Sequence, residues 1–475
     1  LFVLSGEIQR LQASPFFDAE VFADLKDPNT VVAHFSQGGL GLPEREYYLA
    51  TDAEKKTLRA AYEQHVTKML VLSGLPPAEA AKQAKAILVF ETALAKASRP
   101  IEAMRDVQKL HHRLDAPGLA KLTPKLPWER FFSAFGQSDL TAINVMTPEF
   151  FPALQKEIGK APLPTLKAYL RYQLLSATAG LLPDAIYQQH FDFQGRTLAG
   201  QKEPQPRWKR CITATEQAMG EAIGQLYVQE RFAGNSKELA LDMIHGIADA
   251  FAASLPALAW MDETTRQAAL VKKGTLAWKI GYPEEWRDYS KLTITRGNHF
   301  ANAVAARGFE ASRQLAQVGK PVDRKEWGMN AQTVNASYNP LQNAFTYPAG
   351  ILQPPFFHKD FPVAMNLGGM GFVIGHELTH GFDDQGRKSD GDGVLHEWWA
   401  PEVAAKFEQQ AACVDAQYSA VEVEPGVHVN GKLTLGENIG DIGGVKEAFV
   451  AFQGWKSRHK MPAPGDAKEP LIPGL

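Results

Sequence analysis

The 475-residue sequence contains only two cysteines, Cys211 and Cys413, which lie far apart and form no CxxC pair. Two cysteines in a chain of this length are not a disulfide scaffold. Cysteine usage therefore does not place the protein among the small disulfide-rich secreted domains. From composition alone, both cysteines are expected to be buried thiols.

The sequence also lacks a long apolar run. No stretch reaches the roughly 18 apolar residues that a membrane-spanning helix needs, so no transmembrane segment is expected in this chain. The N-terminus, Leu1-Phe2-Val3-Leu4, turns polar at once and has no basic region, so it is too short for a signal peptide. Two interpretations remain open: a cytosolic protein, or one whose export signal was removed or left out.

An excess of charge is the third missing feature. The formal net charge is −3, from 50 basic and 53 acidic residues, which does not point to nucleic acid or to an anionic membrane surface. Apolar residues make up 45% of the chain and charged residues 22%, as is usual for a globular protein with a large core. The length predicts two to four domain-sized units.

Helical patterns dominate the first half of the sequence. Residues 51–74 predict an amphipathic helix that Thr51 or Asp52 caps. Its apolar stripe contains Leu58, Tyr62, His65, Val66, Met69 and Leu70. Pro76-Pro77 begins a second helix that runs to about Ser98. Further helical patterns cover about 107–121, 147–159, 164–181, 212–232, 236–257 and 262–273. This half is therefore expected to be mainly α, with few strands.

The second half changes character after about residue 275. Residues 332–338 and 345–352 carry β-branched and aromatic residues in short runs, which predict strands. Helices are expected over about 366–381, 400–418 and 437–459, and the tail from Met461 onward is expected to be extended. Because 194–208 is polar and rich in Gly and Pro, a domain boundary is predicted near residue 200.

The strongest motif is His376-Glu377-Leu378-Thr379-His380. Residues i and i+4 lie on one face of a helix, so both imidazoles can reach one metal ion. Zinc lowers the pKa of bound water from 15.7 to about 7, so the Glu377 carboxylate can take its proton near neutral pH. The alternative is a core helix that contains two hydrogen-bonded histidines.

A catalytic zinc usually has three protein ligands, so a third is required. Glu437 and Asp441 stand at i and i+4 where a helix begins, so Glu437 can bind the metal while Asp441 orients a ligand histidine. Asp383, three residues after His380, is a second candidate for that orienting role. On the residues alone, Glu437 could instead complement the helix dipole and Asp383 could be a turn residue. Position 386 is Gly, so the HExxHxxGxxH pattern is absent.

With these motifs in register, the chain resembles the neprilysin-like zinc peptidases, which include endothelin-converting enzymes and bacterial oligopeptidases. The resemblance covers essentially the whole sequence. It is carried by Gln37-Gly38-Gly39-Leu40-Gly41-Leu42-Pro43, Tyr47-Tyr48-Leu49, Arg207-Trp208-Lys209-Arg210-Cys211, Trp260-Met261-Asp262, Val334-Asn335-Ala336, Tyr338-Asn339-Pro340, the segment from Pro348 to Phe357, Gly381 to Gly386, and Trp398-Trp399.

The resemblance implies a role for each site residue. His376, His380 and Glu437 would bind one Zn²⁺, Glu377 would be the general base, and Asp383 and Asp441 would orient the histidines. Asn335 and Ala336 would anchor the substrate backbone on an exposed strand, and Ile351, Phe356 and Val373 would wall a hydrophobic pocket for the side chain after the scissile bond. Without the resemblance, Asn335 reads as a turn residue and the three apolar residues as core.

The implied fold is a mainly α, two-domain zincin-type metallopeptidase. A helical lid domain over 1–200 would enclose a cavity, and a thermolysin-like catalytic domain with a small sheet would cover 201–475. The implied reaction is cleavage of short peptides on the amino side of a hydrophobic residue. A monomer in the periplasm or secreted is expected, with peptides and not nucleic acid as partners.

The sequence departs from the family at its ends. The family has a further segment before Gln37-Gly38-Gly39, and it continues past Pro473-Gly474-Leu475 to a transition-state histidine. An oxyanion stabiliser is worth ~10²–10³ in rate. This chain alone is therefore expected to be a weak enzyme or an inactive one. The alternatives are a protein that binds zinc and peptides without turnover, and a purely structural helical protein.

The resemblance also implies that each cysteine would pair with a cysteine outside this chain or remain a free thiol. Gly440 stands where the family often has Ala, which weakens the helix by at most about 1 kcal/mol and leaves the ligands unchanged.

Overall fold

The structure is a computed structural model that describes residues 1–232 and 234–458. The chain forms two compact units, and each combines segments that are distant in sequence. The first contains Leu1–Asp24, Asn29–Met219 and Asp288–Val322, and the second contains Leu25–Pro28, Gly220–Arg287 and the described residues from Asp323 onward. The assignment of 1–200 to a lid and of 201–475 to a catalytic domain stays a prediction. The tail expected from Met461 lies outside the described residues.

Helices make up most of the first unit. As predicted, helix α3 (Ala53–Leu72) begins after Asp52, whose carboxylate accepts a hydrogen bond from the Lys55 N–H. Its stripe from Tyr62 to Leu70 is buried against α4 (Pro77–Ala97) and α8 (Leu163–Thr178). The other helices of this unit are α1 Phe2–Gln9, α2 Glu46–Leu49, α5 Ala116–Leu122, α6 Trp128–Phe135, α7 Phe150–Lys160, α8 Leu163–Thr178, α9 Asp184–Phe191 and α13 His299–Leu315.

The first unit also contains a sheet of four strands that the sequence patterns did not predict. Its order is β1 (Phe17–Ala23), β2 (Val31–Gln37), β4 (Ile143–Val145) and β3 (Arg113–Leu114). Residues 31–35 are all buried, so β2 shows no alternation of apolar and polar residues. The predicted helix over 107–121 is wrong. A short 3₁₀ turn, Val107–Leu110, and then β3 replace its first part, and only its end is helical, in α5, which begins after Asp115 caps its N-terminus.

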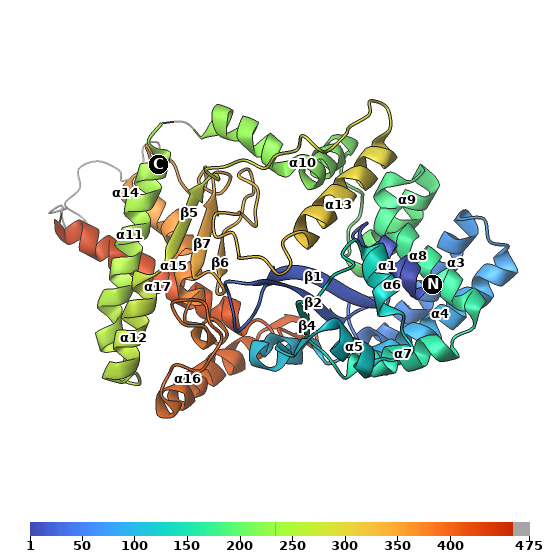
Figure 1. Cartoon of the computed structure of the whole chain (residues 1–475). Coiled ribbons are helices and arrows are strands. Elements are labelled where there is room, and N and C mark those ends of the chain that lie inside the picture. The colour runs from blue at the N-terminus through green and yellow to red at the C-terminus, as the bar shows by residue number, and fades with distance from the viewer. Residues whose placement is uncertain (233, 459–475) are drawn as a thin grey trace. The chain divides into compact units, whose positions relative to one another are not determined.

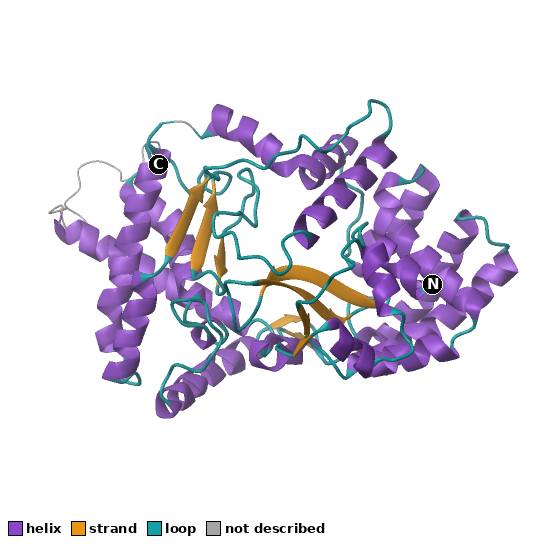
Figure 2. Ribbon diagram, viewed as in Figure 1, coloured by secondary structure: helices purple, strands orange, loops and turns teal. Residues whose placement is uncertain are grey.

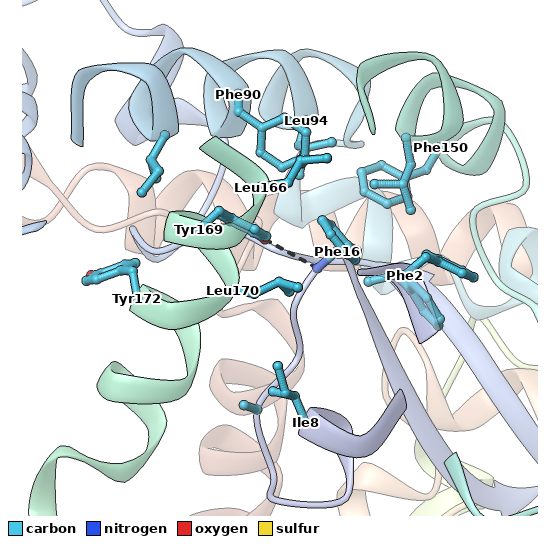
Figure 3. Close-up of a cluster of buried hydrophobic side chains, with 14 of the residues drawn as sticks. Phe2, Ile8, Phe16, Phe90, Leu94, Phe150, Leu166, Tyr169, Leu170 and Tyr172 are labelled. Carbon is cyan, nitrogen blue, oxygen red and sulfur yellow. Dashed lines mark hydrogen bonds between the residues drawn. The ribbon is translucent and has the colours of Figure 1, made fainter. Parts of the chain in front are cut away.

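Aromatic rings fill the core of the first unit (Figure 3). The Phe16 ring centroid lies 6.2 Å from that of Phe2 and 5.4 Å from that of Tyr169. The Tyr169 hydroxyl accepts a hydrogen bond from the Phe16 N–H at 3.3 Å and donates one to the Gly39 carbonyl at 2.7 Å. This core therefore holds the glycine-rich 37–43 loop through a buried phenol.

The chain leaves the first unit inside helix α10 (Arg207–Arg231), which is broken at Met219, where φ is −144° and ψ is 42°. Both cysteines lie on helices, Cys211 on α10 and Cys413 on α16 (Pro401–Ser419). The expectation of burial is wrong, because both are exposed free thiols. Each occupies an outward-facing helical position, which cysteine count alone does not reveal. Among the described residues, we find no helix that combines the length and the apolar character needed to cross a bilayer.

The second unit contains a three-stranded sheet (Figures 1 and 2). Strand β7 (Ala344–Pro348) lies in the middle, parallel to β5 (Ala277–Gly281) and antiparallel to β6 (Ser337–Asn339). Strands β6 and β7 overlap the two predicted strands, whereas β5 was not predicted. The helices of this unit, besides α16 and the end of α10, are α11 Ser236–Ser254, α12 Glu263–Gly274, α14 Val363–Asn366, α15 Phe372–His380 and α17 Leu435–Arg458, and a hairpin joins β8 Glu422–Glu424 to β9 Val427–His428.

Helix α15 lies at the centre of the second unit and packs against α11, α17 and β6. The predicted helix over 366–381 is thus present, although its first part, Leu367–Gly371, is a π-helical turn. Ile374 and Leu378 bury their side chains in the same cluster as Phe345 and Tyr347 of β7. The described residues therefore form the expected mainly α architecture with small sheets.

Candidate metal centre

The two histidines of the HExxH motif face each other on α15. His376 and His380 are one turn apart, and their Nε2 atoms lie 2.9 Å from each other. Ile374 and Leu378 lie on the opposite face of the helix, in the hydrophobic core, so the two histidines lie on the face that is turned away from that core. Both imidazoles are largely covered, with 16% and 17% of the side chain exposed.

A carboxylate from a different helix completes the group. Oε2 of Glu437, in the first turn of α17, lies 3.3 Å from Nε2 of His376 and 3.6 Å from Nε2 of His380. Three donor atoms are thus separated by 2.9–3.6 Å. A tetrahedral zinc ion with bonds of about 2.0–2.2 Å separates its ligand atoms by about 3.3–3.6 Å. The two distances to Glu437 match this separation, and the 2.9 Å between the two Nε2 atoms is a few tenths of an ångström shorter.

Each histidine also contacts a carboxylate through its other ring nitrogen. Nδ1 of His376 lies 2.9 Å from Asp441 Oδ1, and Nδ1 of His380 lies 2.8 Å from Asp383 Oδ2. A carboxylate only accepts, so each Nδ1 carries the proton and each Nε2 presents a lone pair. Two lone pairs at 2.9 Å repel each other unless a cation or a proton lies between them. The tautomers set by the carboxylates therefore suit a metal ion.

Burial lowers the pKa of the His380 imidazole, but its hydrogen bond to Asp383 has the opposite effect and the net pKa is raised. Asp383 is itself fixed, because its Oδ1 accepts hydrogen bonds from the N–H groups of Gln385 and Gly386 at 2.8 and 2.7 Å. Asp383 is almost buried, with 7% of its side chain exposed, whereas Asp441 is 53% exposed. The two orienting carboxylates thus differ in how firmly the fold holds them.

Glycines allow α17 to approach α15 closely enough for this geometry. A Cβ atom on Gly444 would lie 2.7 Å from the Phe372 carbonyl oxygen, and one on Gly443 would overlap the Thr379 side chain. A Cβ atom on Gly440 would lie 2.9 Å from Cε1 of His376. Position 440 therefore bears directly on a predicted ligand, which helix propensity alone does not reveal.

The predicted base, Glu377, is buried on α15 with 6% of its surface exposed. Burial raises the pKa of its carboxyl to about 7, which the His380 charge opposes and the Glu437 carboxylate reinforces. The backbone N–H of Tyr338 in β6 also hydrogen-bonds this carboxyl and lowers the pKa. Glu377 therefore lies between the histidine face of α15 and the outer strand of the sheet.

The predicted substrate anchors come immediately before β6. Asn335 is exposed, and its Oδ1 accepts a hydrogen bond from the Ala336 N–H at 2.9 Å, while Ala336 is buried. Within the described ranges, β6 pairs with β7 on one side and with no strand on the other. An outer strand of this kind can pair with an extended peptide.

The three predicted pocket residues belong to one hydrophobic cluster. Ile351 is buried in it, and Phe356 and Val373 are half-buried and pack against it. Val373 is on α15, three residues before His376. This placement is compatible with a pocket wall and equally with ordinary core packing, so the specificity role stays a prediction.

Sequence reasoning missed Lys272, whose ammonium group contacts the segment that follows α15. Its Nζ donates to the carbonyl oxygens of Gly381, Gly386 and Ser389. A signal was present, because Lys272 occupies the buried stripe of α12 together with Thr265 and Ala269. A lysine on an apolar stripe requires buried acceptors.

Family models and curated relatives both link this chain to a peptidase family. Two family models, both described as peptidase family M13, match residues 1–283 and 335–470. Endothelin-converting enzyme 1 of Homo sapiens is 37% identical over 470 residues, which cover 96% of this chain and 61% of the relative. An endothelin-converting enzyme homolog of Locusta migratoria is 36% identical over 476 residues, covering 96% of this chain and 65% of the relative. The chain thus spans less than two thirds of the length of these curated relatives.

Solved structures are also similar. The zinc metalloprotease Zmp1 of Mycobacterium tuberculosis, in complex with an inhibitor, aligns with a TM-score of 0.93 at 36% identity, covering 100% of this chain and 72% of that one. PepO from Lactobacillus rhamnosis aligns with a TM-score of 0.86 at 28% identity, covering 94% and 71%.

Proposed function

The chain belongs to peptidase family M13, and on that premise we propose that the whole protein is a zinc-dependent endopeptidase. The substrates would be short peptides, cleaved on the amino side of a hydrophobic residue. The observation that carries this proposal is the convergence of Glu437 Oε2 with the Nε2 atoms of His376 and His380. Family membership confirms the resemblance to the neprilysin-like peptidases.

The donor set favours zinc as the metal. Two imidazoles and one carboxylate, with a coordination position left for water, form the ligand set of several catalytic zinc sites. Among residues 1–232 and 234–458, one group of three His, Cys, Asp or Glu side chains brings its ligand atoms within 4.8 Å of one another. The group consists of His376, His380 and Glu437. We therefore propose a single Zn²⁺ held by His376, His380 and Glu437, with Asp441 and Asp383 fixing the histidine tautomers.

When bound, zinc supplies a Lewis acid that acidifies water and polarises the peptide carbonyl. Glu377 is the group proposed to take the proton from that water and to deliver it to the leaving amine as the C–N bond breaks. Its burial suits this cycle, because a carboxyl with a raised pKa can both accept and release a proton near neutral pH. The proton is thus conserved through the step, and the products are a carboxylic acid and an amine, which then ionise to a carboxylate and an ammonium group.

The substrate would bind as an extra strand. The free side of β6 offers backbone groups to an extended peptide, and Asn335 would provide a side-chain amide next to it. Because the Tyr338 N–H of this strand contacts Glu377, a peptide along β6 would pass close to the base. Ile351, Phe356 and Val373 would then receive the hydrophobic side chain after the scissile bond.

Metal analysis and peptide turnover test the proposal on the full-length protein. Purification without chelators should yield one zinc per chain, and the protein should cleave a quenched peptide that carries Phe or Leu after the scissile bond. E377Q should abolish turnover and keep the zinc, because the amide cannot accept the proton. E424Q, at an exposed position in β8, should behave as the unmodified protein.

Each alternative has its own outcome. Absence of zinc, even after reloading, would leave a structural helical protein. Stoichiometric zinc with peptide binding and no turnover would indicate a binding protein. Turnover that persists in E377Q would remove Glu377 from the role of base. The periplasmic or secreted location and the monomeric state stay predictions, which fractionation of the source cells and light scattering can test.

A further inference from the structure

Lys272 has an unusual environment for a charged side chain. It lies in the last turn of α12 with 1% of its surface exposed. Its Nζ donates three hydrogen bonds to backbone carbonyls: 2.6 Å to Gly381, 2.7 Å to Gly386 and 2.7 Å to Ser389. An ammonium group has three donors, so this arrangement uses all of them.

The three carbonyls belong to the segment that leaves the C-terminal end of α15. Gly381 is the residue immediately after His380, and Gly386 follows the turn that contains Asp383. This turn is tightly folded, because a Cβ atom on Gly386 would overlap the His380 carbonyl oxygen. Lys272 therefore holds both ends of the turn whose carboxylate contacts the His380 ring.

A second set of contacts links Lys272 to the outer strand. The Lys272 carbonyl accepts a hydrogen bond from Asn343 Nδ2 at 3.0 Å, and Asn343 Oδ1 accepts one from the Tyr338 hydroxyl at 2.9 Å. The Tyr338 ring also lies 5.7 Å from the Lys272 ammonium. Since the Tyr338 N–H contacts Glu377, one lysine connects the turn after α15 with the strand beside the base.

Keeping a charge at this position has a cost. Burial lowers the pKa of the Lys272 ammonium to about 7, although the Asp383 and Asp390 carboxylates oppose this change. A methionine would fill similar space without a desolvation penalty, but it would leave three carbonyls without their donor. The lysine is therefore matched to the carbonyls of this segment.

We propose that Lys272 is a positioning residue for the metal centre: its ammonium fixes the 381–389 segment, and thereby the orientation of Asp383 and His380. This inference rests on the proposed function, because it assigns the lysine to the same zinc site. Lys272 acts through Asp383 and touches no ligand atom itself. Its loss should therefore alter the metal site beyond any general loss of stability.

The closing experiment compares K272M with K279M in the full-length protein. Lys279 in β5 is a matched control: it is half-buried, and its Nζ donates to the Glu326 carbonyl and the Gln342 side chain, at 2.7 and 2.8 Å. Three quantities are measured: the melting midpoint of the metal-free protein, the zinc Kd by competition with a chromophoric chelator, and the visible spectrum of the Co²⁺-substituted protein.

Both variants should melt at a lower temperature. Only K272M should raise the zinc Kd, by ~10–100-fold as expected for lost support of a ligand, and change the Co²⁺ spectrum. K272R, which keeps the charge but not the three-point geometry, should lie between K272M and the unmodified protein, and it decides the question if K272M does not fold. The proposal would be overturned if the variant that folds had the same zinc Kd and the same Co²⁺ spectrum as the unmodified protein. If the unmodified protein binds zinc but cleaves no peptide, the proposed function fails while the metal measurements still decide the role of Lys272.

Discussion

Nδ1 of His376 lies 2.9 Å from Oδ1 of Asp441, a residue 65 positions later in the chain and on a different helix. This contact and that of Glu437 come from adjacent turns of α17. The same helix thus supplies both a predicted ligand and the group that sets the tautomer of another. The close glycine contact between α15 and α17 makes this possible.

D441N should weaken zinc binding by ~10–100-fold. The amide is almost isosteric, but it is neutral and holds the imidazole Nδ1–H less strongly. Because Asp441 is 53% exposed, the melting temperature of the metal-free protein should change little. Competition with a chromophoric chelator measures the affinity, and an unchanged zinc Kd would contradict the orienting role.

D383N provides a contrast, because Asp383 also accepts hydrogen bonds from two backbone N–H groups. This variant should lose zinc affinity and also melt at a lower temperature. If D441N lowered the melting temperature of the metal-free protein as much as D383N, the burial of each carboxylate would not determine its contribution to stability.

G440A tests the spacing of the two helices. The new Cβ would lie 2.9 Å from the His376 ring, so the ring or the helix must move by a few tenths of an ångström and zinc affinity should fall. G454A on the same helix is the control, because its Cβ would meet only the Arg458 guanidinium at 3.5 Å. G454A should stabilise the protein by up to about 1 kcal/mol without affecting zinc. Equal zinc affinities in the two variants would remove the steric argument.

A buried acid in the first unit predicts a pH-dependent stability. Burial raises the pKa of Glu91 to about 8, although hydrogen bonds from the Tyr62 and Tyr48 hydroxyls lower it. Between the pKa of the unfolded chain, about 4.5, and that of the folded protein, only the folded state keeps the proton. Stability should therefore fall as pH rises through this window, by at most about 1.4 kcal/mol per pH unit.

E91Q has no proton to lose and should reduce this slope, while Glu377, whose carboxyl pKa is also raised, to about 7, still contributes to it. Melting temperatures from pH 5 to pH 8 measure it, and E54Q at an exposed position of α3 should retain the slope of the unmodified protein. Equal slopes in E91Q and in the unmodified protein would show that Glu91 does not keep its proton in the folded state.

N335A should raise the KM for peptides several-fold and leave zinc affinity unchanged, because Asn335 is exposed beside β6 and touches no predicted ligand. N339A at the other end of the strand is the control. Asn339 Oδ1 accepts from the Leu341 and Gln342 N–H groups, so its loss should lower the melting temperature and not the affinity for peptides. Initial rates over a range of peptide concentrations separate the two effects, and an unchanged KM in N335A would argue against the anchor role.

Local patterns predicted the elements whose cause is local. The apolar stripe of α3 and its Asp52 cap, and the placement of His376 and His380 on one face of α15, follow from helical periodicity. The strand pairing of β1 to β4 was missed, because β2 is buried on both faces and its parallel partner, β4, is remote in sequence.

The sequence by itself determined that two imidazoles share a helical face, with a carboxylate between them in the chain, because backbone geometry sets that relation within one turn. Only the tertiary structure decided that Glu437 and Asp441 meet those imidazoles, that residue 440 faces the His376 ring, and that Lys272 supports the turn after α15. These contacts join helices far apart in the chain, and their distances depend on how side chains pack, which no local periodicity contains.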